Sequence, residues 1–348
     1  MFKFSCIVFS CSLGVFLASA QTGLTGPSLG FVFDDSAQAV RPIFGVPGAA
    51  TIGAPVDFGG SAVVAAAVSP HQDYVLAFLA DSTMALLRSK NGVVTVEHHP
   101  EISAVPDLIG LSPSGASAAL FYRQNANVQV LTGLPDSLTV AANLLDISAL
   151  PDSLDNLTIT DDGSALLGGF PENTAPGSQS GEVYLIPADG SAPRSLLQIG
   201  HASALSLFNQ SQDLLVTDDT TGLVYRISGV TASASVSPVL SGMLQIAAPS
   251  GIIASPDDQM IFVSGPSGSI NGSDFAGQNS IQVQCLCQPT ELKRLMGGNA
   301  YQLTELSDGV VWMLYWDPNN PRTLFIPSAW TPPATSSSTP AAALARKR

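Results

Sequence analysis

A short polar turn recurs along this chain at nearly constant spacing, each time between two apolar segments. Its first copy reads Ser69-Pro70-His71-Gln72-Asp73, and the six copies start 43, 48, 49, 46 and 52 residues apart. They occupy residues 69–73, 112–115, 160–163, 209–213, 255–258 and 307–309. A fixed period of this length is typical of architectures built by repeating one supersecondary unit.

The segments beside each turn have the composition of β-strands. YVLAFLA follows the first turn and VVWMLYW follows the last. Such runs are rich in β-branched, aliphatic and aromatic residues and are too short for independent helices. A third and a fourth strand can be read in most units, for example at 181–186 and 194–199. Four strands in about 45 residues is the count of a propeller blade, so we predict an all-β propeller. A β-sandwich explains the short strands but not the repeated turn.

The two ends of the chain suggest how the ring of blades closes. Segments 30–35 and 40–45 resemble the third and fourth strands of a unit, with no first and second strands before them. In the last unit we expect the first strand at 301–306 and the second at 310–316. Because an open ring would expose a sheet edge, we predict that the N-terminal strands complete the C-terminal blade of a six-bladed propeller. Segment 322–327 also reads as a third strand, so seven blades are the alternative.

Residues 1–20 have the pattern of a secretory signal peptide. Lys3 precedes an apolar stretch at 7–17, and Ala18-Ser19-Ala20 ends the segment before Gln21. We therefore expect cleavage after Ala20 and a secreted or periplasmic protein. No apolar run after Gln21 is long enough to cross a membrane, so we expect no membrane span. We place the propeller at 21–330 and a disordered tail rich in Pro, Ser and Thr, with a basic end, at 331–348.

The charge of the chain bears on its partners. It has 13 Lys and Arg residues against 27 Asp and Glu, and a formal net charge of −14. Nucleic-acid binding requires clustered Lys and Arg, so nucleic acid is not an expected partner. A protein, a peptide or a glycan remains as the expected class of partner.

Two of the turns carry a family resemblance. Ser-Pro-Ser-Gly at 112–115 and Ser-Pro-Asp-Asp at 255–258, each followed by an apolar strand, resemble the repeat of WD40-like, YVTN-type and lactonase-type propellers. The resemblance covers nearly the whole chain after residue 20, but it implies a blade and not a chemistry. The segments GFVFDDSAQAVRPIFGVPG and CLCQPTELKRL are also similar to secreted propellers of soil bacteria. That group implies no catalytic residues for this chain.

Cys285 and Cys287 are the two cysteines that follow the predicted cleavage site. Two residues apart on a strand, they point to one face with Cα atoms about 6.6 Å apart, near the upper limit for a disulfide. In an oxidising compartment we predict a local disulfide, with two buried thiols as the alternative. Metal binding is a third interpretation, although a lone Cys-x-Cys lacks the second pair that a zinc site uses.

Four acidic pairs and four histidines are candidate site residues. The pairs at 34–35, 161–162, 218–219 and 257–258 could hold calcium, but none has the spacing of a calcium loop, and Asp at a turn caps its own backbone. His71, His98, His99 and His201 lie in different units without a metal-binding spacing, so we expect them on turns or on the surface. Trp312, Leu314 and Trp316 alternate on one strand, which favours packing between blades over a sugar-stacking platform.

The sequence therefore identifies no catalytic, cofactor-binding or metal-ligating residues, and it leaves the cofactor unknown. A first hypothesis is an exported propeller that acts as a binding or scaffold module for a protein, peptide or glycan at the mouth or rim of its channel. The alternative is a metal-dependent, lactonase-like hydrolase or lyase. It would use channel carboxylates, with His71 or His201 as further ligands.

Overall fold

The computed structural model describes residues 26–151, 154–171, 181–239 and 244–329. These residues form 28 β-strands and a short 3-10 helix, η1 (Arg123–Asn125). The predicted signal peptide (1–20) and the predicted tail (331–348) lie outside the described residues. Within the described part of the chain, no helix has the length and apolar character needed to cross a bilayer.

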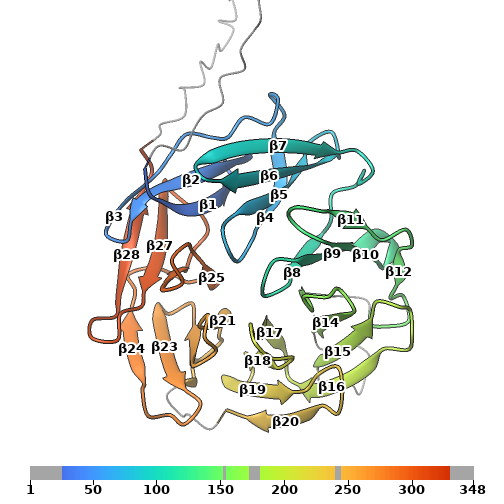
Figure 1. Cartoon of the computed structure of the whole chain (residues 1–348). Helices are drawn as coiled ribbons and strands as arrows, with labels where there is room; N and C mark the ends of the chain where they lie inside the picture. Colours follow the sequence, from blue (N-terminus) through green and yellow to red (C-terminus); the bar gives the residue numbers. More distant parts are fainter. Residues whose placement is uncertain (1–25, 152–153, 172–180, 240–243, 330–348) are drawn as a thin grey trace, which may run out of the picture.

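The strands form seven antiparallel sheets arranged as blades around one axis (Figure 1). The first sheet has three strands, β1 (Ser28–Asp34), β2 (Ala39–Val46) and β3 (Ala49–Ile52). The second to fourth sheets are β4 (Val63–Val68), β5 (Tyr74–Leu79), β6 (Met84–Lys90) and β7 (Val93–His99); β8 (Leu108–Leu111), β9 (Ser117–Tyr122), β10 (Asn127–Thr132), β11 (Thr139–Val140) and β12 (Leu145–Asp146); and β13 (Asn156–Ile159), β14 (Ala165–Phe170), β15 (Gly181–Pro187) and β16 (Arg194–Ile199). The fifth to seventh are β17 (Ala202–Leu207), β18 (Leu214–Asp218), β19 (Leu223–Ser228) and β20 (Ser235–Pro238); β21 (Gly251–Ala254), β22 (Met260–Ser264), β23 (Ser269–Asp274) and β24 (Ile281–Gln284); and β25 (Lys293–Arg294), β26 (Ala300–Gln302), β27 (Val310–Tyr315) and β28 (Arg322–Pro327).

The propeller prediction is confirmed, but the predicted six blades and their mode of closure are wrong. The alternative of seven blades is what the structure has. The N-terminal strands β1 and β2 do not complete the C-terminal blade. They pair with β3 in a sheet of their own, while β25–β28 form a separate, four-stranded last sheet.

A misassigned strand explains this error. Five of the recurring turns join the first and second strands of their sheets, but the turn at 307–309 joins β26 to β27, the second and third strands of the last sheet. The first strand of that sheet is β25, which has two residues, Lys293 and Arg294, and no apolar pattern. The segment Arg322–Pro327, expected as a third strand, is therefore the fourth strand, β28.

The recurring turn has a common hydrogen-bond pattern that explains its residues. Four copies share it, the first, second, third and fifth: in the first, the N–H of Gln72 donates to the Ser69 carbonyl over 2.9 Å, and the N–H of Tyr74 donates to Ser69 Oγ over 3.4 Å. The fourth position has a positive φ in Gln72 (62°), Gly115 (74°), Gly163 (70°) and Asp258 (57°). Glycine adopts this left-handed backbone without steric cost, so Gln72 is the unexpected residue of the series.

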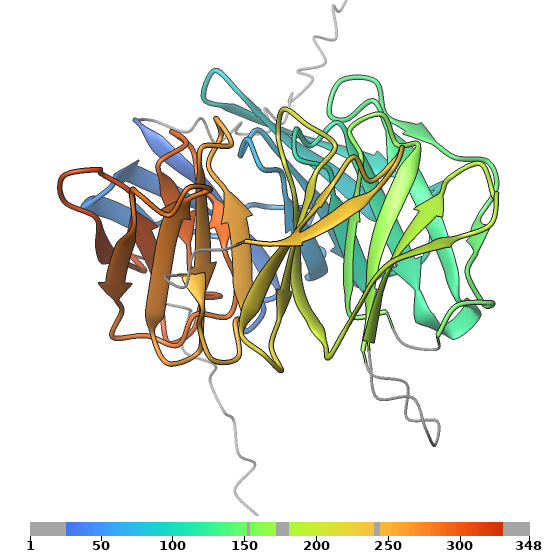
Figure 2. The same cartoon turned by 90° about the horizontal axis from the view of Figure 1, so that it is seen from below.

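Apolar side chains between neighbouring sheets form the core. For example, Tyr74, Leu76 and Phe78 of the second sheet share a buried cluster with Ala118 and Leu120 of the third. Figure 2 shows the sheets from the side, with the strands running between two faces that carry the connecting loops. Each blade therefore buries its faces against its neighbours, as the repeat predicted.

Trp312 on β27 and Trp316 directly after it belong to this packing, as predicted. The ring of Trp316 lies 5.4 Å from that of Phe262 in the sixth sheet, and the ring of Trp312 lies 5.8 Å from that of Phe325 on β28. Both tryptophans pack against a buried cluster of the sixth and seventh sheets.

The ring closes where β28 meets β3. The N–H of Ala329 donates to the Ile52 carbonyl over 3.0 Å, next to a parallel bridge between Ile52 and Ser328. The buried Arg41 of β2 supports this junction, because its guanidinium contacts Asp34 over 2.9 Å and also donates to Ser328 Oγ. The first and last sheets are thus held together by backbone and side-chain contacts, not by a shared sheet.

Candidate ligand-binding channel

A cavity of about 770 Å³ lies within the ring of innermost strands. It is lined mainly by apolar and small side chains, one sheet after another, including Ala67 on β4, Ile109 on β8, Leu157 on β13, Ser206 on β17 and Ile253 on β21. A concave, mostly apolar cavity with a few polar groups is the usual form of a ligand site. The channel is therefore the candidate site.

Charged groups in the channel are concentrated on the seventh sheet. Four charged lining residues lie on the strands of this sheet or beside them: Glu291, Lys293, Arg294 and Glu305. Glu291 forms an ion pair with Lys293 and accepts a hydrogen bond of 2.6 Å from Gln302 Nε2. The Lys293 side chain is 60% exposed and lines the channel.

Arg294 and Gln72 are polar lining residues at the end of the channel where the recurring turns lie. Arg294 is 9% exposed, and its Nη2 donates to Asn209 Oδ1 over 3.1 Å and to the Ala254 carbonyl over 3.2 Å. Burial lowers the pKa of its guanidinium. Gln72 Nε2 donates to the Arg294 carbonyl over 2.6 Å, which links the second and seventh sheets.

The first sheet contributes to the channel differently from the others, because β1 itself lines the cavity with Val32 and Phe33. The turn after β1 shows which strand β1 corresponds to. Asp34 Oδ1 accepts a bond of 3.0 Å from the N–H of Ala37. Asp34 pairs with Ala39 across a four-residue loop that ends at a positive φ, and Asp218 pairs with Leu223 across such a loop between the second and third strands of the fifth sheet. We therefore assign β1, β2 and β3 as second, third and fourth strands, with no innermost strand among the described residues.

The acidic pairs lie at turns, as predicted. The carboxylate of Asp162 accepts a bond of 3.0 Å from the N–H of Ser164, and that of Asp257 accepts one of 3.2 Å from the N–H of Gln259. Thr160 and Ser164 hold the pKa of Asp162 below its usual value. Among the described residues, no three His, Cys, Asp or Glu side chains gather into a possible metal site.

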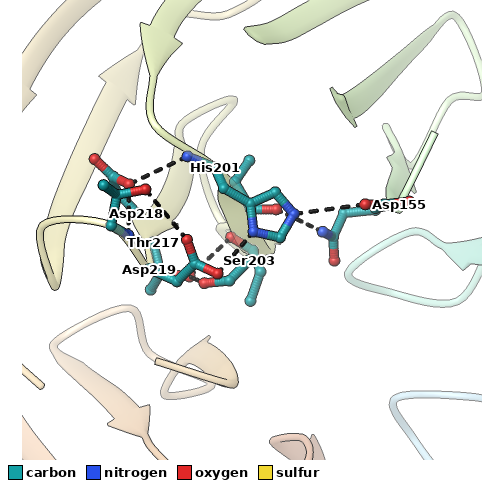
Figure 3. Close-up of polar contacts among 10 residues, drawn as sticks. Asp155, His201, Ser203, Thr217, Asp218 and Asp219 are labelled. Carbon is teal, nitrogen blue, oxygen red and sulfur yellow. Dashed lines mark hydrogen bonds and ion pairs between the residues drawn. The ribbon is translucent and has the colours of Figure 1, made fainter. Parts of the chain in front are cut away.

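His201 is the histidine with the closest carboxylate partners (Figure 3). Its Nδ1 lies 2.7 Å from Asp219 Oδ2, and its Nε2 lies 3.5 Å from Asp155 Oδ2. Burial by itself lowers the pKa of His201, but Asp219 and Asp155 raise it above its usual value. Asp155 precedes β13 and His201 precedes β17, so this cluster joins the fourth and fifth sheets.

The hypothesis that His71 or His201 joins channel carboxylates does not fit this geometry. His201 is not among the channel-lining residues, and neither is His71. His71 lies on a recurring turn, with its Nδ1 2.9 Å from the carbonyl of Ser114 in the next turn. The two histidines therefore belong to different ends of the blades.

Cys285 and Cys287 are joined by a disulfide, with Cα atoms 5.1 Å apart. The intervening Leu286 is 91% exposed. Neither cysteine lines the channel. The predicted cleavage site after Ala20 lies outside the described residues.

Sequence reasoning missed the polar residues of the channel. Gln72 sits in a turn that was identified, but its role depends on the seventh sheet, 222 residues away. Glu291, Lys293 and Arg294 come from the segment ELKR, which follows the two cysteines. The signal that could have marked them is a charged segment at the place where five other units have an uncharged inner strand.

The fold is shared by known structures. The chain has a TM-score of 0.56 and 11% identity to a functionally unknown protein from Desulfotomaculum acetoxidans DSM 771, over 86% of this chain and 99% of that one. It has the same TM-score and 13% identity to a protein described as a "putative 6-phosphogluconolactonase" from Bacteroides uniformis ATCC 8492, over 86% and 96% of the two chains. No family model matches the chain. No curated protein matches it either. At these identities the similarity supports the propeller fold and nothing finer.

Proposed function

We propose that this protein is an exported binding module whose central channel takes a peptide segment of a partner protein. The observation that carries the proposal is the channel of about 770 Å³, with apolar walls and charged groups concentrated on one sheet. Apolar walls contribute affinity through burial, while a few polar groups fix the orientation of the occupant.

The lining residues favour a peptide over a glycan. Sugar-binding sites commonly stack rings on aromatic side chains, and the lining that the structure describes includes one aromatic residue, Phe33. Ala, Val, Leu, Ile, Pro and Ser make up most of the remaining lining, and they suit aliphatic side chains and backbone.

Export is the second part of the proposal. It rests on the basic, apolar and small-residue pattern of residues 1–20. The net charge of −14 supports a partner other than nucleic acid.

Selection from a random heptapeptide library, displayed on phage, tests the binding function on the mature chain (21–348). Ser206→Trp places a large ring in the channel, whereas Ser237→Trp on the exposed outer strand β20 of the same sheet is the matched control. We expect enriched peptides to bind the wild type and Ser237→Trp but to lose at least tenfold in affinity for Ser206→Trp. Thermal unfolding of both variants checks that they remain folded.

Two outcomes contradict the proposal. One is a selection that enriches no peptide. The other is hydrolysis of lactones by the mature chain that needs a stoichiometric metal and is lost on substitution of the channel carboxylate Asp107 by Asn. The second outcome favours the hydrolase alternative.

A further inference from the structure

We propose that the inner edge of β1 is a strand-pairing site, where an extended, uncharged and apolar partner segment adds to the first sheet as its innermost strand. This inference rests on the proposed peptide-binding function and specifies where and how the peptide binds. Three observations support it: the direction in which the backbone N–H and C=O groups of β1 point, the absence of partners for some of these groups within the described part of the chain, and the apolar side chains on either side.

The register of the first sheet fixes which β1 groups face the channel. Phe31 lies opposite Pro42, and Phe33 lies opposite Val40. Pro42 has no N–H to donate, and its carbonyl accepts from Gly53 N over 2.8 Å on the β3 side. Because paired residues in an antiparallel ladder alternate between bonded and non-bonded, Phe31 and Phe33 both direct their N–H and C=O groups away from β2.

One half of this inner edge is already paired, though not with a strand of its own. The N–H of Phe31 donates to Gln72 Oε1 over 2.8 Å, and the Leu29 carbonyl accepts from Met296 N over 2.9 Å. The side-chain amide of Gln72 thus occupies a place that the backbone amide of an innermost strand would take. Gly30 permits this approach, since a Cβ at that position would lie 1.9 Å from Gln72 Oε1.

The other half of the edge is open. Within the described part of the chain, nothing pairs with the N–H or the carbonyl of Phe33, or with the carbonyl of Phe31. Phe33 lines the channel together with Val32 and Asp35, so these groups have open space beside them. An unpaired strand edge is a template for an added strand, and such addition is a recurrent mode of peptide recognition.

The surroundings define the chemistry of the occupant. The channel lining includes apolar side chains from both neighbouring sheets: Ala66 and Val68 of β4, and Leu292 and Leu306 of the seventh sheet, the last two beside the charged groups of that sheet. A strand that packs against apolar side chains on both faces is itself a near-continuous apolar run. Apart from β25 (Lys293–Arg294), the protein's own inner strands illustrate this, since they have four to six residues and no charge: VVAAAV, LIGL, NLTI, ASALSL and GIIA. The occupant is a segment of the same kind, antiparallel to β1.

Phe33→Pro tests the pairing directly. Proline removes the unpaired N–H of the inner edge without removing a β1–β2 hydrogen bond, and a proline is tolerated where its nitrogen faces an open edge. Phe33→Val is the matched control, because it also removes the ring but keeps the N–H. Binding of the peptides enriched by the library is measured by fluorescence anisotropy with the mature chain and both variants. We expect Phe33→Pro to bind at least about tenfold more weakly than Phe33→Val.

N-methylation of the enriched peptides is the complementary measurement. A strand added to β1 uses every second N–H for pairing, so methylation at alternate positions should weaken binding and methylation at the intervening positions should not. Equal binding of the two methylated series, or of Phe33→Pro and Phe33→Val, overturns the inference. Loss of binding in Ser206→Trp would then still support the channel as the binding site, so the two proposals can fail separately. Stronger peptide binding after removal of residues 330–348 would identify the chain's own end as the occupant and would also overturn it.

Discussion

The first and second sheets are neighbours built from similar strands, yet they meet the channel in different ways. In the second sheet, β4 lies innermost, and its backbone pairs with β5 along five residue pairs. In the first sheet, the described residues provide no such strand, and the side chain of Gln72 bonds part of the exposed edge. The comparison teaches that one recurring turn serves two purposes, since the turn that connects β4 to β5 also covers the edge of the sheet next to it.

Ring closure gives the largest expected effect, because it concerns a buried ion pair. Arg41→Met leaves Asp34 buried without its partner at the junction of the first and last sheets, which should cost about 3–5 kcal/mol of unfolding free energy. Arg88→Met in the second sheet removes an exposed pair with Glu97 and should cost about 0–1 kcal/mol. Urea unfolding of both variants measures the difference. Equal losses would contradict a special role for the first sheet.

The ion pair between Asp34 and Arg41 also predicts how the stability of the protein depends on pH. Burial raises the pKa of Asp34, but Ser36 and Arg41 outweigh burial and hold it below the usual value. A carboxyl group whose pKa is lowered on folding stabilises the folded state at pH values above the usual carboxyl pKa. This contribution is lost as the pH falls through the pKa that the group has in the folded state. The stability difference between the wild type and Arg41→Met should therefore shrink on acidification. A difference that does not vary with pH would contradict the pairing.

Removal of the Gln72 amide should give the next largest effect. Gln72→Leu leaves two buried backbone groups unpaired, the N–H of Phe31 and the carbonyl of Arg294, at about 1–3 kcal/mol each. The matched control is Gln210→Leu, at an exposed position of the corresponding turn in the fifth sheet. Thermal unfolding should distinguish them clearly. Similar midpoints would show that Gln72 does not stand in for a strand.

A double-mutant cycle sharpens the comparison at Gly30. Gly30→Ala places a methyl group against the Gln72 side chain, at a φ of +125°, and should cost about 1–3 kcal/mol. Gly59→Ala has a φ of +72° but open space around it, so it measures the cost of a side chain at a positive φ without a steric contact. Because Gln72→Gly removes the group that the methyl meets, the double variant should lose less than the sum of the single losses. Strict additivity would exclude the contact.

The smallest effect concerns His201, at the junction of two complete sheets. Since Asp219 and Asp155 raise its pKa above the usual value despite partial burial, its protonated form stabilises the fold. This contribution is fully present below the usual histidine pKa and is lost as the pH rises through the folded value. His201→Gln should remove that pH dependence without affecting peptide binding. An unchanged pH dependence of unfolding would contradict the assignment.

The complete sheets could be predicted from the sequence because the residues that indicate each strand and turn lie next to one another in the chain. Segments such as YVLAFL (Tyr74–Leu79) combine β-rich composition with a polar turn, and four strands then follow in order. The blade count was mispredicted where this local information fails. β25 consists of Lys293 and Arg294, so nothing in its composition indicates a strand, and the turn at 307–309 was assigned one strand too early.

The candidate site could not be predicted for a different reason. The bond between Gln72 and Arg294 joins positions 222 residues apart, and neither side chain belongs to a recognisable motif. The open edge of β1 depends on the register of Phe33 against Val40 and on the channel beside it. Such features follow from the closed ring and not from any single segment.

Hydrogen exchange at the Phe33 amide tests the central claim most directly. Leu76, in the middle of β5 and paired on both sides, provides the internal reference. We predict that the Phe33 N–H exchanges much faster than that of Leu76 in the free mature protein and becomes protected when a selected peptide is bound. A Phe33 amide as protected as Leu76 in the free protein, or one that peptide binding leaves unchanged, would contradict an open strand edge in the channel.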